Sequence, residues 1–363
     1  MSFSLKVYGL KVSYFTGKLE AYLRYKEIPY EFVVMTAKQF KRTIKAHTGA
    51  MQMPAIQLSD GRWMTDTTPI IEWFEQEYPD YPIIPSDPLT QFAAYLIEDY
   101  ADEWLWRPAM HYRWSYPESA ALLAEQISSV MGVDLILPRW LKRYAIHRRQ
   151  YTNFVKRDGV SKATREHVEQ SYLHLLERLA PIVSSRGFLF GERPTLADIG
   201  LMGPMLRHFS MDPAPAAIMR EQYPEVMSWV YRVWSARGSR VAGPLNHAIT
   251  LDLNPLLKEI AETHLPALVA NAQAFVAGQS HYSFTVQGVD YHAIQTSRYR
   301  AWCLQRLQER LAESRDPNAL RQRLKGLGII EALESIEPVQ SGYNEHGSIP
   351  FSGSLPVFQS VRG

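Results

Sequence analysis

The sequence predicts three parts: a small α/β domain at the N-terminus, an all-helical domain, and an α+β extension at the C-terminus. Short strand-like and helix-like segments alternate over residues 1–80. A proline-rich connector, residues 81–88, follows. From residue 88 to about residue 245 the apolar residues recur with helical spacing. The pattern changes again over residues 246–363, where helices and a hairpin are expected together. A chain of 363 residues is long enough for two or three such parts.

The N-terminal domain is expected to hold a small mixed sheet covered by helices. Its segments follow the order β-α-β-α-β-β-α, in which a βαβ crossover implies a parallel pair and a hairpin adds an antiparallel pair. The turn Ser59-Asp60-Gly61 between two short apolar runs is typical of a hairpin. The strands are expected around residues 5–8, 28–34, 54–58 and 62–64, and the helices around residues 18–26 and 38–45 and from residue 69.

Apolar stripes at helical spacing mark the second domain, for example Phe92, Leu96 and Tyr100, or Val168 to Val183. The segment between Arg139 and Arg165 holds nine Lys/Arg and one Asp, and we interpret it as a helix with a basic solvent face. A phosphate- or membrane-binding patch is the alternative interpretation of this segment.

The extension is expected to contain a hairpin with the two-residue loop Gln287-Gly288, and helices around residues 256–275, 304–311 and 324–333. Its tail carries Phe351 and Phe358. Because so few apolar stripes would make a thin core alone, we expect residues 246–363 to pack on the body and to bury both side chains.

Composition excludes several classes of protein. With 39 Lys+Arg against 37 Asp+Glu the net charge is +2, so overall charge favours neither nucleic acid nor a membrane as a partner. The single cysteine, Cys303, excludes a disulfide framework, a zinc ribbon and a CxxC redox centre. The start of the chain lacks a secretory signal pattern and no run of eighteen apolar residues occurs. We therefore expect a cytoplasmic protein.

Common catalytic motifs are missing from the sequence. Seven residues separate Gly9 from Gly17, where a phosphate loop needs four, and Leu19 stands where that loop has a Ser or Thr. The histidines show no HxxxH or HExxH spacing, so no metal is expected. A GxSxG elbow, which would indicate a hydrolase, is also absent.

Ser13 is the first candidate site residue. It lies between the first strand and the first helix, where backbone N–H groups converge and favour an anion. A hydroxyl at that position can donate a hydrogen bond to a thiolate and so favour the ionised form of a thiol. The alternative is that Ser13, or Thr16, simply caps the helix.

Two further positions could bind a peptide-like ligand. Met53-Pro54 precedes a strand, and a cis bend there would leave the Met53 backbone free to pair with an extended peptide. Asp66 and Thr67 precede the next helix, where the carboxylate could bind an amino group and Thr67, with the exposed N–H groups, a carboxylate. A strand-entry proline and a plain helix cap are the respective alternatives.

Taken together, these residues resemble the glutathione transferase superfamily. Val7-Tyr8-Gly9, Ser13 and Lys18-Leu19 are similar in spacing to the serine-type, phi-like classes, and Gln52-Met53-Pro54 is similar to the family's Gln-Val-Pro. Thr65-Asp66-Thr67-Thr68-Pro69-Ile70 resembles its γ-glutamyl site, and Pro194-Thr195-Leu196-Ala197-Asp198-Ile199 resembles the capping box of its buried helix. The resemblance covers about residues 3–240 and implies a thioredoxin-like N-terminal domain followed by the all-α transferase domain.

The resemblance implies a transferase that uses glutathione as co-substrate, needs no metal, and attacks an apolar, aromatic electrophile. The glutathione contacts would be Gln52, Met53, Asp66 and Thr67, with Lys41 as a weaker candidate for the glycyl carboxylate. Ser13 would activate the thiol. Tyr14 is the alternative, because it replaces the family's Pro and Tyr14-Phe15-Thr16-Gly17 resembles the tyrosine-type classes.

The dense aromatic run after the connector could line the electrophile pocket, although packing between helices would explain it equally well. Its members are Trp104, Trp106, Met110, Tyr112 and Trp114. The resemblance also implies a homodimer. Residues 246–363 have no counterpart in a typical transferase, so a non-catalytic interaction or ligand-binding protein is the alternative function.

Overall fold

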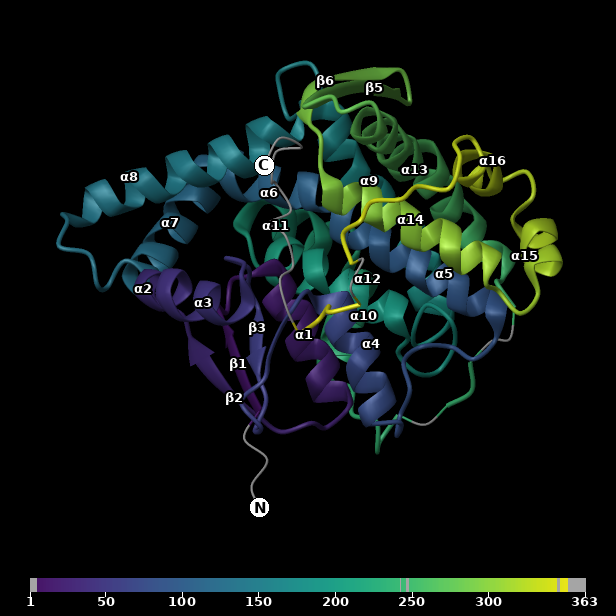
Figure 1. Ribbon diagram of the computed structural model, residues 1–363, viewed down its shortest axis with the longest axis horizontal. Helices are drawn as coiled ribbons and strands as arrows, with labels where there is room; N and C mark the ends of the chain where they lie inside the picture. Colours follow the sequence, from purple (N-terminus) through teal and green to yellow (C-terminus); the bar gives the residue numbers. More distant parts are fainter. Residues whose placement is uncertain (1–4, 242, 246–247, 345–346, 352–363) are drawn as a thin grey trace.

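A four-stranded mixed sheet with the order β2-β1-β3-β4 forms the centre of the N-terminal domain (Figure 1). The computed structural model describes residues 5–241, 243–245, 248–344 and 347–351. β1 pairs with β2 in parallel, and the pairs β1–β3 and β3–β4 are antiparallel. The strands are β1 (Leu5–Gly9), β2 (Tyr30–Val34), β3 (Ala55–Gln57) and β4 (Trp63–Thr65).

Helices cover both faces of this sheet. Val7 and Ile56 point into the main core with α1 (Tyr14–Tyr25) and α4 (Thr67–Glu77). On the other face Ala55 and Trp63 join a smaller cluster with Met35 and Ile44, beneath the irregular helical stretch between β2 and β3. That stretch comprises α2 (Ala37–Gln39), η1 (Phe40–Ile44) and α3 (Lys45–Thr48). The element order and the mixed sheet confirm the thioredoxin-like prediction.

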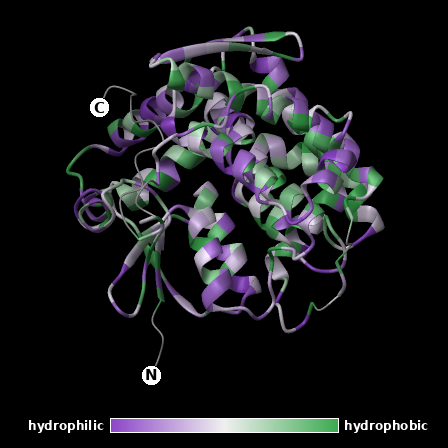
Figure 2. Ribbon diagram, turned by 45° about the vertical axis from the view of Figure 1, so that its right-hand side comes forward, coloured by the Kyte–Doolittle hydropathy of each residue, from purple (hydrophilic) through white to green (hydrophobic). Residues whose placement is uncertain are grey.

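The second domain is all-helical, and α10 lies at its centre against α1 and α5. Every residue of α10 is buried, and its first turn carries the predicted capping box between Thr195 and Asp198. The helices are α5 (Pro88–Asp99), η2 (Tyr100–Trp104), α6 (Trp106–Ser115), α7 (Pro117–Met131), α8 (Arg139–Gln150), η3 (Tyr151–Val155), η4 (Lys156–Asp158), α9 (Arg165–Ser185), α10 (Leu196–Pro204), η5 (Met205–Phe209), α11 (Pro213–Gln222) and α12 (Pro224–Ser235). Figure 2 shows hydrophobic and hydrophilic residues alternating along single helices, as amphipathic helices require.

The extension adds further helices and a two-stranded sheet. As predicted, β5 and β6 form a hairpin around Gln287 and Gly288, which both have positive φ, at 49° and 76°. The elements are η6 (Leu251–Leu253), α13 (Asn254–Val276), β5 (His281–Val286), β6 (Val289–Gln295), α14 (Arg298–Ala312), α15 (Pro317–Leu324) and α16 (Ile329–Leu333).

Residues 324–333 differ from the expected single helix. α15 ends at Leu324, and α16 begins only at Ile329. Gly326 and Gly328 lie between them with φ of 78° and 83°, a left-handed conformation that cannot continue an α-helix.

The extension lies against both domains (Figure 1). α14 packs on α5, and α13 packs on α9 and η2. Arg310 pairs with Glu72 on α4, and the ring of Phe351 meets that of Trp73 edge-on at 5.5 Å. Phe358 lies outside the described residues. None of the helices in the described part of the chain has the length and apolar character that a membrane span requires.

Candidate functional site

A cavity of about 410 Å³ lies between the N-terminal domain and the helical domain. Its wall includes the loop before α1, the segment before β3, the start of α4, and parts of η2, α6, α7, α8 and η3. Tyr299 and Arg300 of the extension complete it. Of the residues singled out in the sequence, Ser13, Tyr14, Gln52, Met53, Asp66, Thr67, Trp106, Met110 and Trp114 line this cavity.

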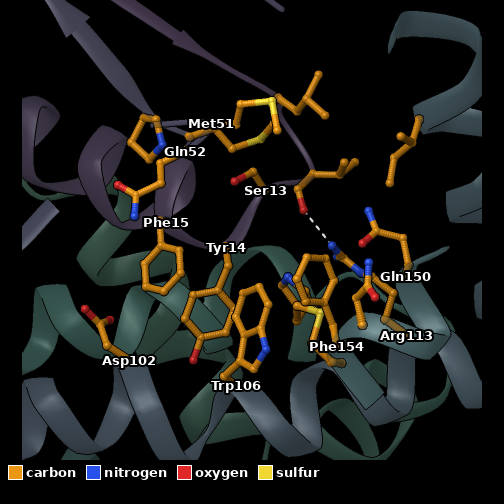
Figure 3. Close-up of a pocket in the computed structure, with 18 of the residues that line it drawn as sticks. Ser13, Tyr14, Phe15, Met51, Gln52, Asp102, Trp106, Arg113, Gln150 and Phe154 are labelled. Atoms are coloured by element: carbon orange, nitrogen blue, oxygen red, sulfur yellow. Dashed lines mark hydrogen bonds between the residues drawn. The ribbon is translucent and has the colours of Figure 1, made fainter. Parts of the chain in front are cut away.

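Ser13 is the N-cap of α1 and also faces the cavity (Figure 3). Its Oγ accepts a long hydrogen bond of 3.4 Å from the Thr16 backbone N–H, so it caps the helix and still keeps its own proton to donate. The loop before it is held from the other domain, because Arg113 donates to the Val12 carbonyl oxygen at 2.6 Å. Arg113 is itself fixed by Asp212 at 2.8 Å.

Tyr14 contributes only its ring to the cavity. Its hydroxyl donates to the Ala101 carbonyl oxygen at 2.5 Å and is buried, and Figure 3 shows it pointing away from Ser13. Burial, together with the nearby Asp102 and Glu103 carboxyls, raises the pKa of the Tyr14 hydroxyl well above its usual value. This hydroxyl is therefore engaged within the core, although the ring of Tyr14 lines the cavity.

Gln52 and Met53 lie in the segment that leads into β3, and both are half-buried at the cavity wall. The Met53–Pro54 peptide is cis, which is one of the two interpretations that the sequence left open for this segment. Lys41 lies on η1, where it is exposed, and it does not line the cavity.

Asp66 does not cap α4, although it directly precedes the helix. Its backbone has φ 74° and ψ 111°, a conformation that costs a non-glycine residue about 1–3 kcal/mol. Its Oδ1 accepts a hydrogen bond from the Tyr299 hydroxyl at 3.2 Å. Its Oδ2 is buried and has no hydrogen-bond partner among the described residues. The strained conformation thus directs a carboxylate into the cavity wall, and the simple cap is excluded for Asp66.

Burial raises the pKa of Asp66 to about 7. The positive charge of Lys18 and the hydrogen bond from Tyr299 act in the opposite direction, whereas the charges of Glu98 and Glu103 raise the pKa further. Asp66 therefore changes its charge near neutral pH, so a cation bound beside it would favour the ionised form.

A buried network of charges lies next to Asp66. The Lys18 ammonium contacts Glu98, Thr68 and, at 2.5 Å, Asp102. Burial alone would lower the pKa of Lys18, but the two carboxylates outweigh it and the pKa is raised. Asp102 lines the cavity and its Oδ1 is buried with no partner among the described residues. This end of the cavity is therefore acidic.

The aromatic run after the connector divides between the cavity and the core. Trp106, Met110 and Trp114 recur every four residues, so they share the helix face that lines the cavity. Trp106 stacks on Phe15 with the ring centres 5.6 Å apart. Trp104 and Tyr112 point elsewhere, which corrects their assignment to this cavity. Trp104 packs on the extension's Tyr291, and Tyr112 packs on Tyr116 and Tyr172.

Several lining residues gave no signal in the sequence. They are Asp102, Arg113, Gln150, Phe154, His208, Tyr299 and Arg300. Burial, and then the charge of Arg113, lower the pKa of His208 well below its usual value, so this side chain is neutral. None of these residues stands in a local motif, because distant segments bring them together. No group of side chains suited to a metal ion occurs in the described part of the chain.

Two family models match the sequence. The N-terminal domain of glutathione S-transferases matches residues 7–82, and the C-terminal domain of glutathione S-transferases matches residues 144–236. No curated protein sequence matches this chain at a significant level.

Solved structures with related architecture are distant in sequence. A glutathione S-transferase from Methylobacterium radiotolerans, in complex with glutathione sulfonate, is 20% identical with a TM-score of 0.39 and covers 63% of this chain and 90% of its own. A glutathione S-transferase from Rhodospirillum rubrum is 16% identical with a TM-score of 0.44, and the match covers 67% of this chain and 98% of its own. A beta-etherase from Sphingobium sp. is 20% identical with a TM-score of 0.44, and the match covers 63% of this chain and 94% of its own.

Proposed function

We propose that this chain, which carries both domains of the glutathione transferase superfamily and belongs to it, is a glutathione transferase. It would activate the glutathione thiol for attack on an apolar, aromatic electrophile. The observation that carries the proposal is the position of Ser13. A hydroxyl with a proton to donate lies at the start of α1 and faces a cavity that is also lined by acidic and aromatic side chains.

Glutathione would lie with its γ-glutamyl end at the acidic part of the cavity. Asp66 would bind the ammonium group, while Thr67 and the first N–H groups of α4 would bind the α-carboxylate. The cysteinyl backbone would lie along Met53, with Gln52 beside it. Lys41 is left out of this arrangement because it does not line the cavity.

The chemical step would be nucleophilic addition or substitution. The thiol loses its proton to solvent, and the Ser13 hydroxyl donates a hydrogen bond to the thiolate, which lowers the thiol pKa. The sulfur electron pair then forms a C–S bond with the electrophile. In substitution the leaving group departs with its electron pair, and in addition the product takes up a proton from water. Trp106, Met110 and Trp114 would hold the electrophile near the sulfur.

Calorimetric titration with glutathione, combined with ultraviolet titration of the bound thiol, tests the proposal. We expect saturable binding at millimolar glutathione and a thiol pKa below that of free glutathione. Binding without a lowered thiol pKa would contradict catalysis and would favour a ligand-binding protein of the same fold.

The proposed function includes an oligomeric state and a cellular compartment. Members of the superfamily typically dimerise, and we propose a cytoplasmic homodimer. Light scattering on the purified chain would measure the oligomeric state, and a mass equal to one chain would contradict a dimer.

A further inference from the structure

We propose that the C-terminal extension is part of the ligand site, and that Tyr299 is a positioning residue that orients Asp66 toward the ammonium group of the bound thiol peptide. This inference rests on the proposed function. It assigns a role to α14, which lies outside the residues that the two family models match.

The contact between Tyr299 and Asp66 leaves one carboxylate oxygen for a ligand. The Tyr299 hydroxyl donates to Oδ1 at 3.2 Å, and Oδ2 is buried without a partner among the described residues. A carboxylate held through one oxygen has the direction of its second oxygen fixed. A buried carboxylate oxygen left without a partner is costly, so the arrangement suits a ligand that donates hydrogen bonds.

Among the described residues, no nearby cation is free to pair with the Asp66 carboxylate. Lys18 contributes its field to Asp66, but its ammonium group is already engaged by Glu98, Asp102 and Thr68. No described cation forms an ion pair with Asp66. Buried carboxylates are normally paired with a cation, and an ammonium group on the ligand would supply it here.

The neighbours of Tyr299 hold it at the cavity wall. Its ring meets those of Trp302 and Tyr343 at 5.6 and 5.2 Å. The next residue, Arg300, is buried and tied to Glu103 at 2.8 Å and to Asp158 at 2.9 Å. The start of α14 therefore cannot move without breaking buried ion pairs.

The tail of the extension approaches the same wall at two further points. A hydrogen bond with Gln52 is among the influences on the pKa of Tyr343, which burial raises. The Thr65 backbone N–H, next to Asp66, donates to the Pro350 carbonyl oxygen at 3.1 Å. The extension thus contacts the segments that carry both Gln52 and Asp66.

The charged and titratable groups around Asp66 decide how its charge responds to pH. They are Lys18 on α1, Glu98 on α5, Asp102 and Glu103 on η2, and Tyr299, Cys303 and Tyr343 of the extension. Of these, Tyr299 donates the hydrogen bond that favours the ionised carboxylate. Removing that hydrogen bond must raise the pKa of Asp66.

The test compares Tyr299→Phe with the wild type in the full-length chain. Calorimetry gives the Kd for glutathione and for its N-acetyl derivative, which lacks the ammonium group, on both sides of pH 7. Tyr22→Phe is the matched control, because it also removes a buried hydroxyl that donates to a carboxylate, that of Glu75 at 3.0 Å, but it does not line the cavity.

We expect Tyr299→Phe to weaken glutathione binding about tenfold at neutral pH. It should leave the affinity for the N-acetyl derivative unchanged, and it should move the midpoint of the pH dependence upward. A purely structural role would weaken both ligands equally and leave the midpoint in place, and so would overturn the inference.

Unchanged or tighter glutathione binding by Tyr299→Phe, with a wild type that binds, would overturn this inference alone. Tighter binding would mean that Tyr299 blocks the site. A wild type that binds neither ligand would overturn the proposed function together with the inference. If Tyr299→Phe does not fold, the wild type still tests whether the ammonium group is recognised. Equal affinities of the wild type for glutathione and its N-acetyl derivative would show that it is not, and would overturn the inference.

Discussion

The Tyr14 hydroxyl and the Ala101 carbonyl oxygen form a buried hydrogen bond of 2.5 Å, which ties the start of α1 to η2. The bond faces the core, whereas the neighbouring Ser13 hydroxyl faces the cavity. The two adjacent hydroxyls therefore have different surroundings: that of Tyr14 is part of the packing, and that of Ser13 lies at the cavity where we propose that glutathione binds.

Ser13→Ala should lower turnover about 10- to 100-fold with little change in glutathione affinity. A hydrogen bond to a charged group contributes about 1.5–3 kcal/mol, and each 1.36 kcal/mol is tenfold in rate. Tyr14→Phe should leave turnover nearly unchanged and lower the thermal midpoint of unfolding. Steady-state kinetics with an aromatic electrophile measures the first effect. A silent Ser13→Ala beside an inactive, folded Tyr14→Phe would reverse the assignment.

Glutathione affinity should depend on pH through Asp66. Its pKa of about 7 is raised, mainly by burial, and the ionised form is the one that binds an ammonium group. Affinity should therefore be full above pH 7 and fall as the pH drops, approaching about tenfold per pH unit. Calorimetry across this range measures it. In Asp66→Asn the dependence should disappear and binding should be weak throughout, so a variant that keeps the wild-type pH profile would show that another group titrates.

Trp106→Ala should raise the KM for an aromatic electrophile about tenfold, because a half-buried ring at the cavity wall is lost. The KM for glutathione should stay the same. Trp140→Ala is the matched control, since Trp140 on α8 is 68% exposed and does not line the cavity. Equal KM values in both variants would assign Trp106 to packing alone.

Truncation after residue 245 should yield an aggregating or strongly destabilised chain. It would remove Arg300 and leave Glu103 and Asp158 buried with one fewer cation each. Loss of one partner of a buried ion pair costs about 3–5 kcal/mol. Thermal unfolding and light scattering measure the outcome. A soluble truncated chain that unfolds cooperatively and binds glutathione fully would show that the extension is a separate module.

Asp198→Ala should destabilise the helical domain by at least about 2 kcal/mol. Asp198 accepts hydrogen bonds from the backbone of Leu189 and Thr195 and from the indole of Trp229, and a buried donor left unpaired costs about 1–3 kcal/mol. Asp316→Ala removes a comparable but exposed cap on α15 and should cost only about 1 kcal/mol. Denaturation followed by circular dichroism compares the two, and equal losses would contradict the central role of α10.

Sequence alone was sufficient wherever the determining interactions are local. The loop Gln287-Gly288 predicted its hairpin, and both residues have the positive φ that a two-residue type I′ turn needs. The capping box of Thr195 and Asp198 was predictable because its partners are three residues apart. The expected single helix over residues 324–333 was wrong, since the left-handed glycines at 326 and 328 outweighed the apolar spacing around them.

By itself, the sequence determined the β-α-β-α-β-β-α order and placed Ser13, Met53 and Asp66 between elements, because periodicity and turn residues act over a few positions. Only the tertiary structure decided that the Tyr14 hydroxyl faces the core and that Tyr299, 233 residues after Asp66, contacts its carboxylate. The physical reason is that the direction of a side chain and the burial of a charge depend on segments distant in sequence, and no local pattern records those.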